Sequence, residues 1–272
     1  MEMSMEKSRP IITLITDFGL RDPYVGTMKG VMLKINPELS FVDLTHEIES
    51  HNILEAAMIL GSAYRYFPKD TIHLVVVDPG VGSDRRPILA LTDKYYFVSP
   101  DNGVLSFVYK DPGLKKVLEL GAKRYFLDEV GDTFHGRDIF SPVASWLSKG
   151  VDVSSFGDEI HNYVQIPIPE SELENNRIKG RIVYVDKFGN LVSNIKMSLF
   201  RKALSASSKK KFKITLGTLE INEINKYYIE KEKGTASALF NSWGNLEIYV
   251  PMKSASKIYG IKKGKKITID FI

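Results

Sequence analysis

The strand and helix patterns of this sequence change character near residue 177, and this change constrains the fold more than any other feature. Before it, apolar strand patterns such as 11–16 and 72–77 alternate with helical patterns, one of which we expect to start with Asp22 as cap and Pro23 as first residue. This alternation predicts an α/β domain with a mostly parallel sheet flanked by helices. After it, helical patterns nearly vanish and short strand patterns follow between Gly and Asn turns, which predicts an all-β barrel domain.

A polar stretch with two prolines separates the two patterns, at residues 163–177. Its composition, YVQIPIPESELENNR, is typical of a connection between domains. We therefore place an N-terminal α/β domain at 1–165, a linker at 166–178 and a C-terminal β-barrel domain at 179–272.

The charges divide between the same two parts of the chain. Residues 1–176 carry 17 Lys and Arg against 26 Asp and Glu, a formal charge of −9, whereas residues 177–272 carry 20 against 7, a formal charge of +13. A basic domain is one signature of nucleic-acid binding. The basic residues are dispersed and form no recognised nucleic-acid-binding motif, so this function is the less favoured alternative and no nucleic-acid partner is expected.

Cysteine is absent, which excludes disulfides, thiolate metal sites and cysteine nucleophiles. The five histidines show no helical i, i+4 pairing, so a metal site is only weakly supported. No apolar run approaches the ~18 residues of a membrane-spanning helix, and the first residues lack the apolar core of a secretory signal. The expected location is the cytoplasm, without a membrane partner.

Three Asp residues, Asp17, Asp78 and Asp101, each follow a predicted strand. Ligands of open parallel sheets bind beyond the carboxyl ends of the strands, so three carboxylates at one edge indicate a site. Turn formation would also explain each of them singly. The phosphate-binding loop, the dinucleotide fingerprint and the nucleophile elbow are all missing from the sequence.

Three polar turns concentrate further functional groups. Residues 133–138 place an imidazole, a guanidinium and a carboxylate around one Gly, and the turns 186–190 and 241–245 form a similar pair in the barrel domain. Turn chemistry is one explanation, because Gly supplies a positive φ and Asn and Asp bond their own backbone. A ligand site that draws on turns of both domains is the other.

Six motifs resemble, in the same order, those of the S-adenosyl-L-methionine hydroxide adenosyltransferases, the hydrolytic relatives of the fluorinases and chlorinases. They lie within about residues 11–252 and are Thr16–Gly19, Val77–Gly82, Ser99–Gly103, Thr133–Asp138, Phe188–Asn190 and Asn241–Gly244. The resemblance implies an N-terminal α/β domain, a C-terminal β-barrel domain and a homotrimer with active sites between subunits. It also implies the reaction of S-adenosylmethionine with water to give adenosine and L-methionine. S-adenosylmethionine is then the substrate, and neither a cofactor nor a metal is expected.

The resemblance further implies roles for single residues. Asp78, Arg85 and His135 match the trio that activates water, and Asp17 matches the carboxylate that binds both ribose hydroxyls. The remaining residues match substrate-binding positions: Asp186 and Ser242 for the methionine amine and carboxylate, Asn190 at the adenine edge, Tyr227 or Tyr228 against the adenine ring, and in addition Asp22, Tyr24, His51, Phe134, Trp243, Val250 and Met252.

Two positions bear on whether water or a halide is the nucleophile. Gly136 stands where the halogenating relatives have a Ser that helps to hold the halide, and His51 stands where the fluorinase has a Trp near the substrate. Both differences favour the hydrolase. A halide-using adenosyltransferase of the chlorinase or fluorinase type is the alternative.

Overall fold

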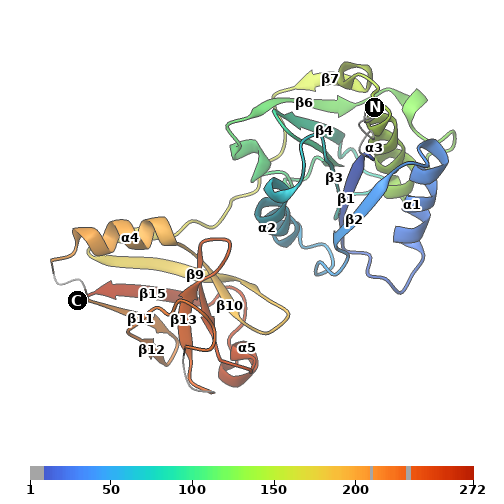
Figure 1. The fold of residues 1–272 in the computed structure, drawn as a ribbon. Coiled ribbons are helices and arrows are strands. Elements are labelled where there is room, and N and C mark those ends of the chain that lie inside the picture. Colours follow the sequence, from blue (N-terminus) through green and yellow to red (C-terminus); the bar gives the residue numbers. More distant parts are fainter. Residues whose placement is uncertain (1–8, 209–210, 231–233) are drawn as a thin grey trace, which may run out of the picture. The chain divides into compact units, whose positions relative to one another are not determined.

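The computed structural model describes residues 9–208, 211–230 and 234–272. The chain divides into two compact units, Met1–Pro167 and Ile168–Ile272, which we call the N-terminal and the C-terminal unit (Figure 1). The first contains a sheet flanked by helices, and the second contains an antiparallel, barrel-like sheet. Within the described ranges, no helix is both long and apolar enough to cross a membrane.

A seven-stranded sheet forms the centre of the N-terminal unit. Its strands are β1 (Ile11–Thr16), β2 (Ser40–Thr45), β3 (Ile72–Val76), β4 (Pro87–Thr92), β5 (Tyr96–Pro100), β6 (Leu114–Leu120) and β7 (Gly157–Ile160). They follow the order β2-β1-β3-β5-β4-β6-β7. The neighbours from β2 to β5 are parallel, whereas β4, β6 and β7 join by antiparallel pairings. The sheet is therefore mixed: one half is parallel as predicted, and hairpin connections such as that from β4 to β5 make the other half antiparallel.

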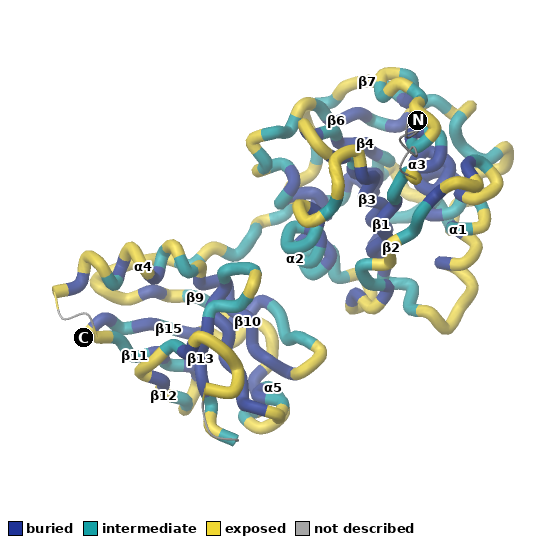
Figure 2. Tube along the Cα trace, in the orientation of Figure 1, coloured by how far each residue is buried: buried dark blue, intermediate teal, exposed yellow. Residues whose placement is uncertain are grey.

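Helices cover both faces of this sheet. They are α1 (Tyr24–Ile35), α2 (Ile53–Ala63) and α3 (Ser141–Ser148), with a π-helical turn at Gly136–Phe140 before α3 and short 3-10 turns at Tyr64–Tyr66, Val108–Lys110, Lys123–Tyr125 and Val153–Ser155. α1 and α3 pack against the face that carries Ile12 and Leu14, and α2 packs against the face that carries Ile15. Alternate residues of a strand point to opposite faces, and β1 is buried on both faces from Ile12 to Thr16 (Figure 2).

The strand order brings three carboxyl ends to one edge of the sheet. β1, β3 and β5 are parallel neighbours. Asp17, Asp78 and Asp101 each follow one of these strands within two residues. The prediction that the three strand ends share an edge is thus confirmed by the pairing of the strands.

The start of α1 differs from the prediction. The helix begins at Tyr24, its N-cap position is Pro23, and no side chain caps it. The carbonyl of Pro23 already accepts the first helical hydrogen bond, from the N–H of Thr27 at 2.8 Å. Asp22 therefore lies outside the helix, exposed, and is not its cap.

An eight-stranded antiparallel sheet forms the C-terminal unit. Its strands are β8 (Glu172–Glu174), β9 (Arg177–Val185), β10 (Leu191–Lys196), β11 (Phe212–Leu216), β12 (Leu219–Ile221), β13 (Ser237–Phe240), β14 (Asn245–Tyr249) and β15 (Lys266–Phe271). They follow the order β12-β11-β15-β9-β10-β14-β13, and β8 pairs with β9. Alternate apolar residues such as Ile178, Ile182, Ile267 and Ile269 point into a single core, which gives the sheet its barrel-like form (Figure 2).

Two helices contradict the prediction of an all-β C-terminal domain. They are α4 (Met197–Ala206) and α5 (Ala255–Tyr259). α4 buries Phe200 and Ala203, a face too short to give a clear helical period in the sequence. The stretch predicted as a linker, 166–178, also contains the short strand β8.

Candidate functional site

Asp17 lies in a tight turn directly after β1. Its side chain is 8% exposed, and Oδ2 accepts a hydrogen bond of 2.9 Å from the backbone N–H of His51. Gly19 adopts a φ of +64°, which favours glycine, and its N–H donates to the carbonyl of His46 at 2.8 Å. The segment after β2 thereby fixes the turn. No described residue donates to Asp17 Oδ1, so this oxygen is available to a ligand.

Three aromatic rings pack against one another beside this turn. The centroid of Phe18 lies 5.7 Å from that of Tyr24 and 5.8 Å from that of Phe134, and the last two are 5.3 Å apart. Tilted and edge-on arrangements of this kind are favourable for aromatic pairs. Tyr24 and Phe134, both predicted from the sequence, are therefore brought together against Phe18, the residue that follows Asp17.

Asp78, Arg85 and His135 form one hydrogen-bonded group. Arg85 Nε donates to Asp78 Oδ1 at 3.0 Å, and its Nη2 donates to Asp78 Oδ2. The same Nη2 lies 3.0 Å from Nδ1 of His135. A guanidinium has only donors, so His135 Nδ1 is the acceptor and the proton of the neutral imidazole lies on Nε2. The structure thus brings the predicted trio together.

Burial controls the protonation of this trio. It raises the pKa of the Asp78 carboxyl above its ordinary value, against the opposing effect of the Arg85 guanidinium. Burial, together with the positive charge of Arg85, lowers the pKa of His135 below its ordinary value. His135 is therefore neutral at pH 7 and can accept from Arg85.

One donor of Arg85 has no partner within the described part of the chain. Its Nη1 atom is buried and unpaired, while the guanidinium lies over the ring of Phe140, 5.3 Å from the centroid. A buried donor without an acceptor costs about 1–3 kcal/mol, and more when it is charged. This N–H is available to an oxygen atom of water or of a ligand.

Two other acidic residues singled out in the sequence hold loops in place. Asp101 Oδ2 accepts from Arg86 at 3.1 and 2.6 Å, and its Oδ1 accepts from the N–H of Val164 at 2.8 Å. Asp138 is fully buried and accepts from Arg137 at 2.5 and 3.0 Å. Loop formation accounts for these hydrogen bonds of both carboxylates.

Gly136 has little room for a side chain. An added Cβ would lie 3.1 Å from Phe134 Cε2, 3.3 Å from Met28 Sδ and 3.4 Å from Val76 Cγ1. Neighbours at such distances must shift, which costs packing energy. A Ser at this position would therefore require these side chains to rearrange.

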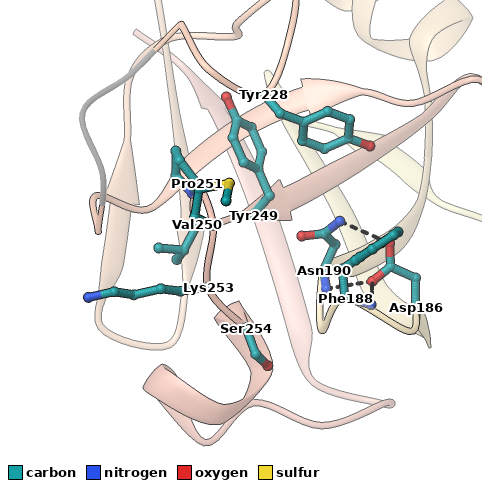
Figure 3. A pocket seen from close by; sticks show the side chains of 10 residues that line it. Asp186, Phe188, Asn190, Tyr228, Tyr249, Val250, Pro251, Lys253 and Ser254 are labelled. Carbon is teal, nitrogen blue, oxygen red and sulfur yellow. Dashed lines mark hydrogen bonds between the residues drawn. The ribbon is translucent and has the colours of Figure 1, made fainter.

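A separate pocket of about 540 Å³ lies in the C-terminal unit (Figure 3). Its walls come from the turn between β9 and β10, the end of β14 with the residues after it, and the loop of Tyr228. The lining residues are Asp186, Phe188, Asn190, Tyr228, Tyr249, Val250, Pro251, Met252, Lys253 and Ser254. Among those predicted for substrate binding, Asp186, Asn190, Tyr228, Val250 and Met252 are brought together here.

Asp186 shapes the turn from which Asn190 projects. Asp186 Oδ1 accepts from the N–H groups of Phe188 at 2.9 Å and Asn190 at 2.8 Å, and Oδ2 accepts from Asn190 Nδ2 at 2.9 Å. Gly189 adopts a φ of +83°, and a Cβ there would lie 2.0 Å from Ser254 Oγ, so only glycine fits. Figure 3 shows the carboxamide oxygen of Asn190 pointing away from Asp186. That oxygen is available to a hydrogen-bond donor.

The aromatic wall of the pocket is held from behind by a buried carboxylate. Tyr228 and Tyr249 pack edge to face, with ring centroids 5.0 Å apart. The Tyr228 hydroxyl donates to Glu247 Oε1 at 2.9 Å, and Asn241 Nδ2 donates to Glu247 Oε2 at 3.0 Å. Glu247 is 2% exposed, and burial raises the pKa of its carboxyl.

Three predicted residues, Tyr227, Ser242 and Trp243, do not line this pocket. Ser242 and Trp243 lie in the turn before β14, where Asn241 Oδ1 accepts from the N–H of Trp243 at 3.0 Å. The Trp243 ring packs against Tyr184 instead, at 5.8 Å. The sequence left open whether Tyr227 or Tyr228 faces the ligand, and the structure places Tyr228 in the pocket.

Other residues of the pocket were missed from the sequence. They are the lining residues Phe188, Tyr249, Pro251, Lys253 and Ser254, and Glu247 behind Tyr228. The available signal was the alternation in β14, which puts Asn245, Glu247 and Tyr249 on one face and Leu246 and Ile248 in the core.

Within the described ranges, no group of three or more His, Asp or Glu side chains is arranged to hold a metal ion. The carboxylates of the candidate site are engaged in other ways, Asp78 by Arg85 and Asp186 by its own turn. The expectation that the protein needs neither a metal nor a cofactor stays a prediction.

Comparison with known families matches both units. The family models described as the SAM hydroxide adenosyltransferase N-terminal domain and C-terminal domain match residues 12–157 and 180–268. The chain belongs to the SAM hydroxide adenosyltransferase family. The resemblance inferred from the six motifs is confirmed.

Individual relatives agree with the match to this family. The chain is 35% identical to an (R)-S-adenosyl-L-methionine hydrolase of Methanocaldococcus jannaschii over 260 residues, 92% of either chain. It is similar to the crystal structure of an uncharacterized conserved protein from Thermotoga maritima, with a TM-score of 0.88 and 36% identity over 96% of this chain and 99% of that one. A fluorinase of Nocardia brasiliensis is more distant, at 25% identity over 96% of this chain and 97% of its own.

Proposed function

We propose that this protein hydrolyses S-adenosyl-L-methionine, in the (R) configuration at sulfur, to adenosine and L-methionine. The observation that carries the proposal is the hydrogen-bonded group of Asp78, Arg85 and His135, in which the first two side chains are buried. It occurs in a chain that is 35% identical to a relative named as an (R)-S-adenosyl-L-methionine hydrolase. The (R) configuration is taken from that name.

The reaction is a displacement at the ribose C5′ atom. The oxygen of water bonds to C5′ while the bond from C5′ to the sulfonium breaks, and the electron pair of that bond goes to sulfur. The leaving group is a neutral thioether, so no general acid is required. Catalysis therefore depends on how the protein holds the water and receives its proton.

The trio supplies both functions. Free water has a pKa of about 15.7, far above that of any carboxyl, so full deprotonation before attack is excluded as the main route. Asp78 retains lone pairs beside the two that accept from Arg85, and it takes the proton as the new bond forms. Arg85 fixes Asp78 and His135 with one guanidinium, and its free Nη1 donates to the attacking oxygen.

Substrate binding is proposed for residues of each unit. The free oxygen of Asp17 suits a ribose hydroxyl, and the free carboxamide oxygen of Asn190 suits the amino group of adenine, with Tyr228 against the ring. Asp186 already accepts three hydrogen bonds, and a carboxylate has about four acceptor positions, so one remains for the methionine ammonium. The homotrimer with sites between subunits and the cytoplasmic location stay predictions. Light scattering of the purified protein measures the first.

Use of a halide instead of water is the second possibility that the family offers. The packing around Gly136 disfavours it, because a Ser there would meet Phe134 and Met28 at 3.1 and 3.3 Å. We therefore favour water as the nucleophile.

The test is incubation of the purified protein with separated (R) and (S) epimers in ¹⁸O-labelled water, with and without chloride or fluoride. The expected products are equal amounts of methionine and adenosine from the (R) epimer, with ¹⁸O at the 5′ oxygen of adenosine. Asp78→Asn is the inactive control. Full activity of that variant, or label outside adenosine, would falsify the mechanism, and a 5′-halo-5′-deoxyadenosine product would establish the halide alternative.

A further inference from the structure

The pocket of the C-terminal unit is backed by a buried carboxylate that has no counter-charge among the described residues. Glu247 lies in the middle of β14 and is 2% exposed. Its partners, the Tyr228 hydroxyl and the Asn241 carboxamide, are both neutral. No cationic group of the described chain acts on it, whereas the nearby Asp186 repels it. A buried charge in such surroundings costs free energy unless something compensates it.

Hydrogen bonding alone does not require this charge. A glutamine in place of Glu247 would accept from Asn241 through Oε1 and donate from Nε2 to the Tyr228 hydroxyl, which can rotate to accept. Asn241 need not turn, because its own Oδ1 still accepts from the N–H of Trp243 at 3.0 Å and of Asn245 at 3.1 Å. The network thus needs a side chain of this size and polarity, and the negative charge has another purpose.

The surroundings of the charge point to a cation. Tyr228 joins Glu247 to the pocket, since its hydroxyl lies 2.9 Å from Oε1 and its ring lines the cavity. Asp186, the second carboxylate, lines the same cavity. Figure 3 shows the ammonium of Lys253 pointing away from this cavity. The faces of the aromatic rings in the wall attract cations independently of the carboxylates.

We propose that Glu247 is a specificity-determining residue, whose carboxylate provides the counter-charge for a positively charged ligand in the pocket lined by Tyr228. This inference rests on the proposed function. S-adenosylmethionine carries a sulfonium, an ammonium and a carboxylate, a net charge of +1, whereas the product adenosine is neutral. Glu247 therefore favours the substrate over adenosine and assists release of the product.

The experiment measures the binding of two stable ligands by titration calorimetry. One is adenosine, which is neutral, and the other is sinefungin, in which a carbon with an ammonium group replaces the sulfonium, so that the net charge is +1. Glu247→Gln should weaken sinefungin about tenfold and leave adenosine nearly unchanged. Coulomb's law gives this factor for a unit charge about 8 Å away at an effective dielectric constant of about 30.

Two control variants separate charge from structure. Tyr228→Phe keeps the carboxylate and removes its hydrogen bond, so it should weaken both ligands by similar factors. Glu174→Gln removes an exposed carboxylate paired with Lys179, near the start of β9 and far from the turn of Asp186, and should change neither affinity. If Glu247→Gln did not fold, Glu247→Asp, which withdraws the charge by one methylene, should lower the same affinity ratio by a smaller factor.

An unchanged ratio of the two affinities in Glu247→Gln, or in Glu247→Asp if only that variant folds, would overturn the proposal, because a purely structural role affects both ligands alike. Failure of the wild-type protein to bind either ligand would instead contradict the proposed function. The two failures are therefore distinguishable.

Discussion

Nη2 of Arg85 lies 3.0 Å from Nδ1 of His135, and the same guanidinium holds both carboxylate oxygens of Asp78. One side chain therefore sets the position of the other two. Its planar fork is essential to this arrangement, because the contacts come from two nitrogen atoms held in one plane, a geometry that the single nitrogen of an ammonium cannot reproduce.

Arg85→Lys should for this reason abolish most of the activity although the charge is kept. We expect kcat for adenosine release to fall by about 10²–10³-fold, the range found when one positioned donor is lost, with a much smaller effect on KM. The exposed Arg124 offers a matched control, since Arg124→Lys should be neutral. A kcat of Arg85→Lys within about twofold of the wild type would show that the fork is not needed.

The value of kcat/KM should fall as the pH is lowered into the acid range. His135 and Asp78 both act unprotonated. The pKa of His135 is lowered from 6.5, and that of Asp78 is raised from 3.8, so activity is full at pH 7 and is lost as the pH falls below 6.5. Initial rates between pH 4.5 and 8 at constant ionic strength measure it. His135→Gln should leave a residual activity whose acid limb reflects Asp78 alone, and a wild-type midpoint at or above 6.5 contradicts the assignment.

Gly136→Ala should destabilise the N-terminal unit by about 1–3 kcal/mol, because the new methyl group overpacks the site. Its neighbours would be Phe134, Met28 and Val76 at 3.1–3.4 Å. Gly26 of α1 is the control, since nothing lies within 4 Å of an added Cβ there and alanine is the better helix former. Urea denaturation should show opposite signs for the two variants. A stabilised Gly136→Ala would mean that the site has more room than the structure shows.

His73 should make the fold sensitive to acid. His73 is buried in β3, and its Nδ1 shares a hydrogen bond of 2.8 Å with Thr13 Oγ1. Burial lowers the pKa of the imidazole to about 3. Between pH 3 and 6.5 the unfolded chain binds a proton there and the native state does not, so this contribution to stability is lost as the pH falls. The loss from pH 7 to pH 5 is about 2 kcal/mol.

The variant His73→Phe lacks this titration, so its free energy of unfolding should fall less between pH 7 and pH 5 than that of the wild type. Denaturation by urea at the two pH values measures the difference. His161→Gln, at an exposed position, should behave as the wild type does. Equal pH dependence of His73→Phe and the wild type would refute the prediction.

The sequence predicted best those elements whose burial is complete. β1 and β3 are buried on both faces, so their apolar runs identify them and place Asp17 and Asp78 at their ends. The trio was predicted through the resemblance to the family and not through any periodicity: Asp78 and His135 lie within two of the six motifs, and Arg85 lies outside them. The mixed sheet was not foreseen as a whole, since parallel and antiparallel neighbours give similar apolar patterns in a buried strand.

The pocket was harder to predict because one of its walls is a loop, whose sequence has no periodic pattern of apolar residues. In β14, Glu247 and Tyr249 alternate with Leu246 and Ile248, a pattern that normally marks a solvated face. The loop with Tyr227 and Tyr228 covers this face, through the bond from Tyr228 to Glu247 and that from the Tyr249 hydroxyl to the Tyr227 carbonyl at 3.3 Å. Coverage by a distant loop leaves no local signal in the strand.

The turn of Asp186 has a consequence for the order in which the protein folds. The three hydrogen bonds that the Asp186 carboxylate accepts come from residues at most four positions away, and the turn joins the antiparallel neighbours β9 and β10. Local contacts of this kind need little loop closure, and isolated hairpins form within about 1–10 μs. One wall of the ligand pocket can therefore take shape as the nascent hairpin closes, before the remote strands of the barrel arrive.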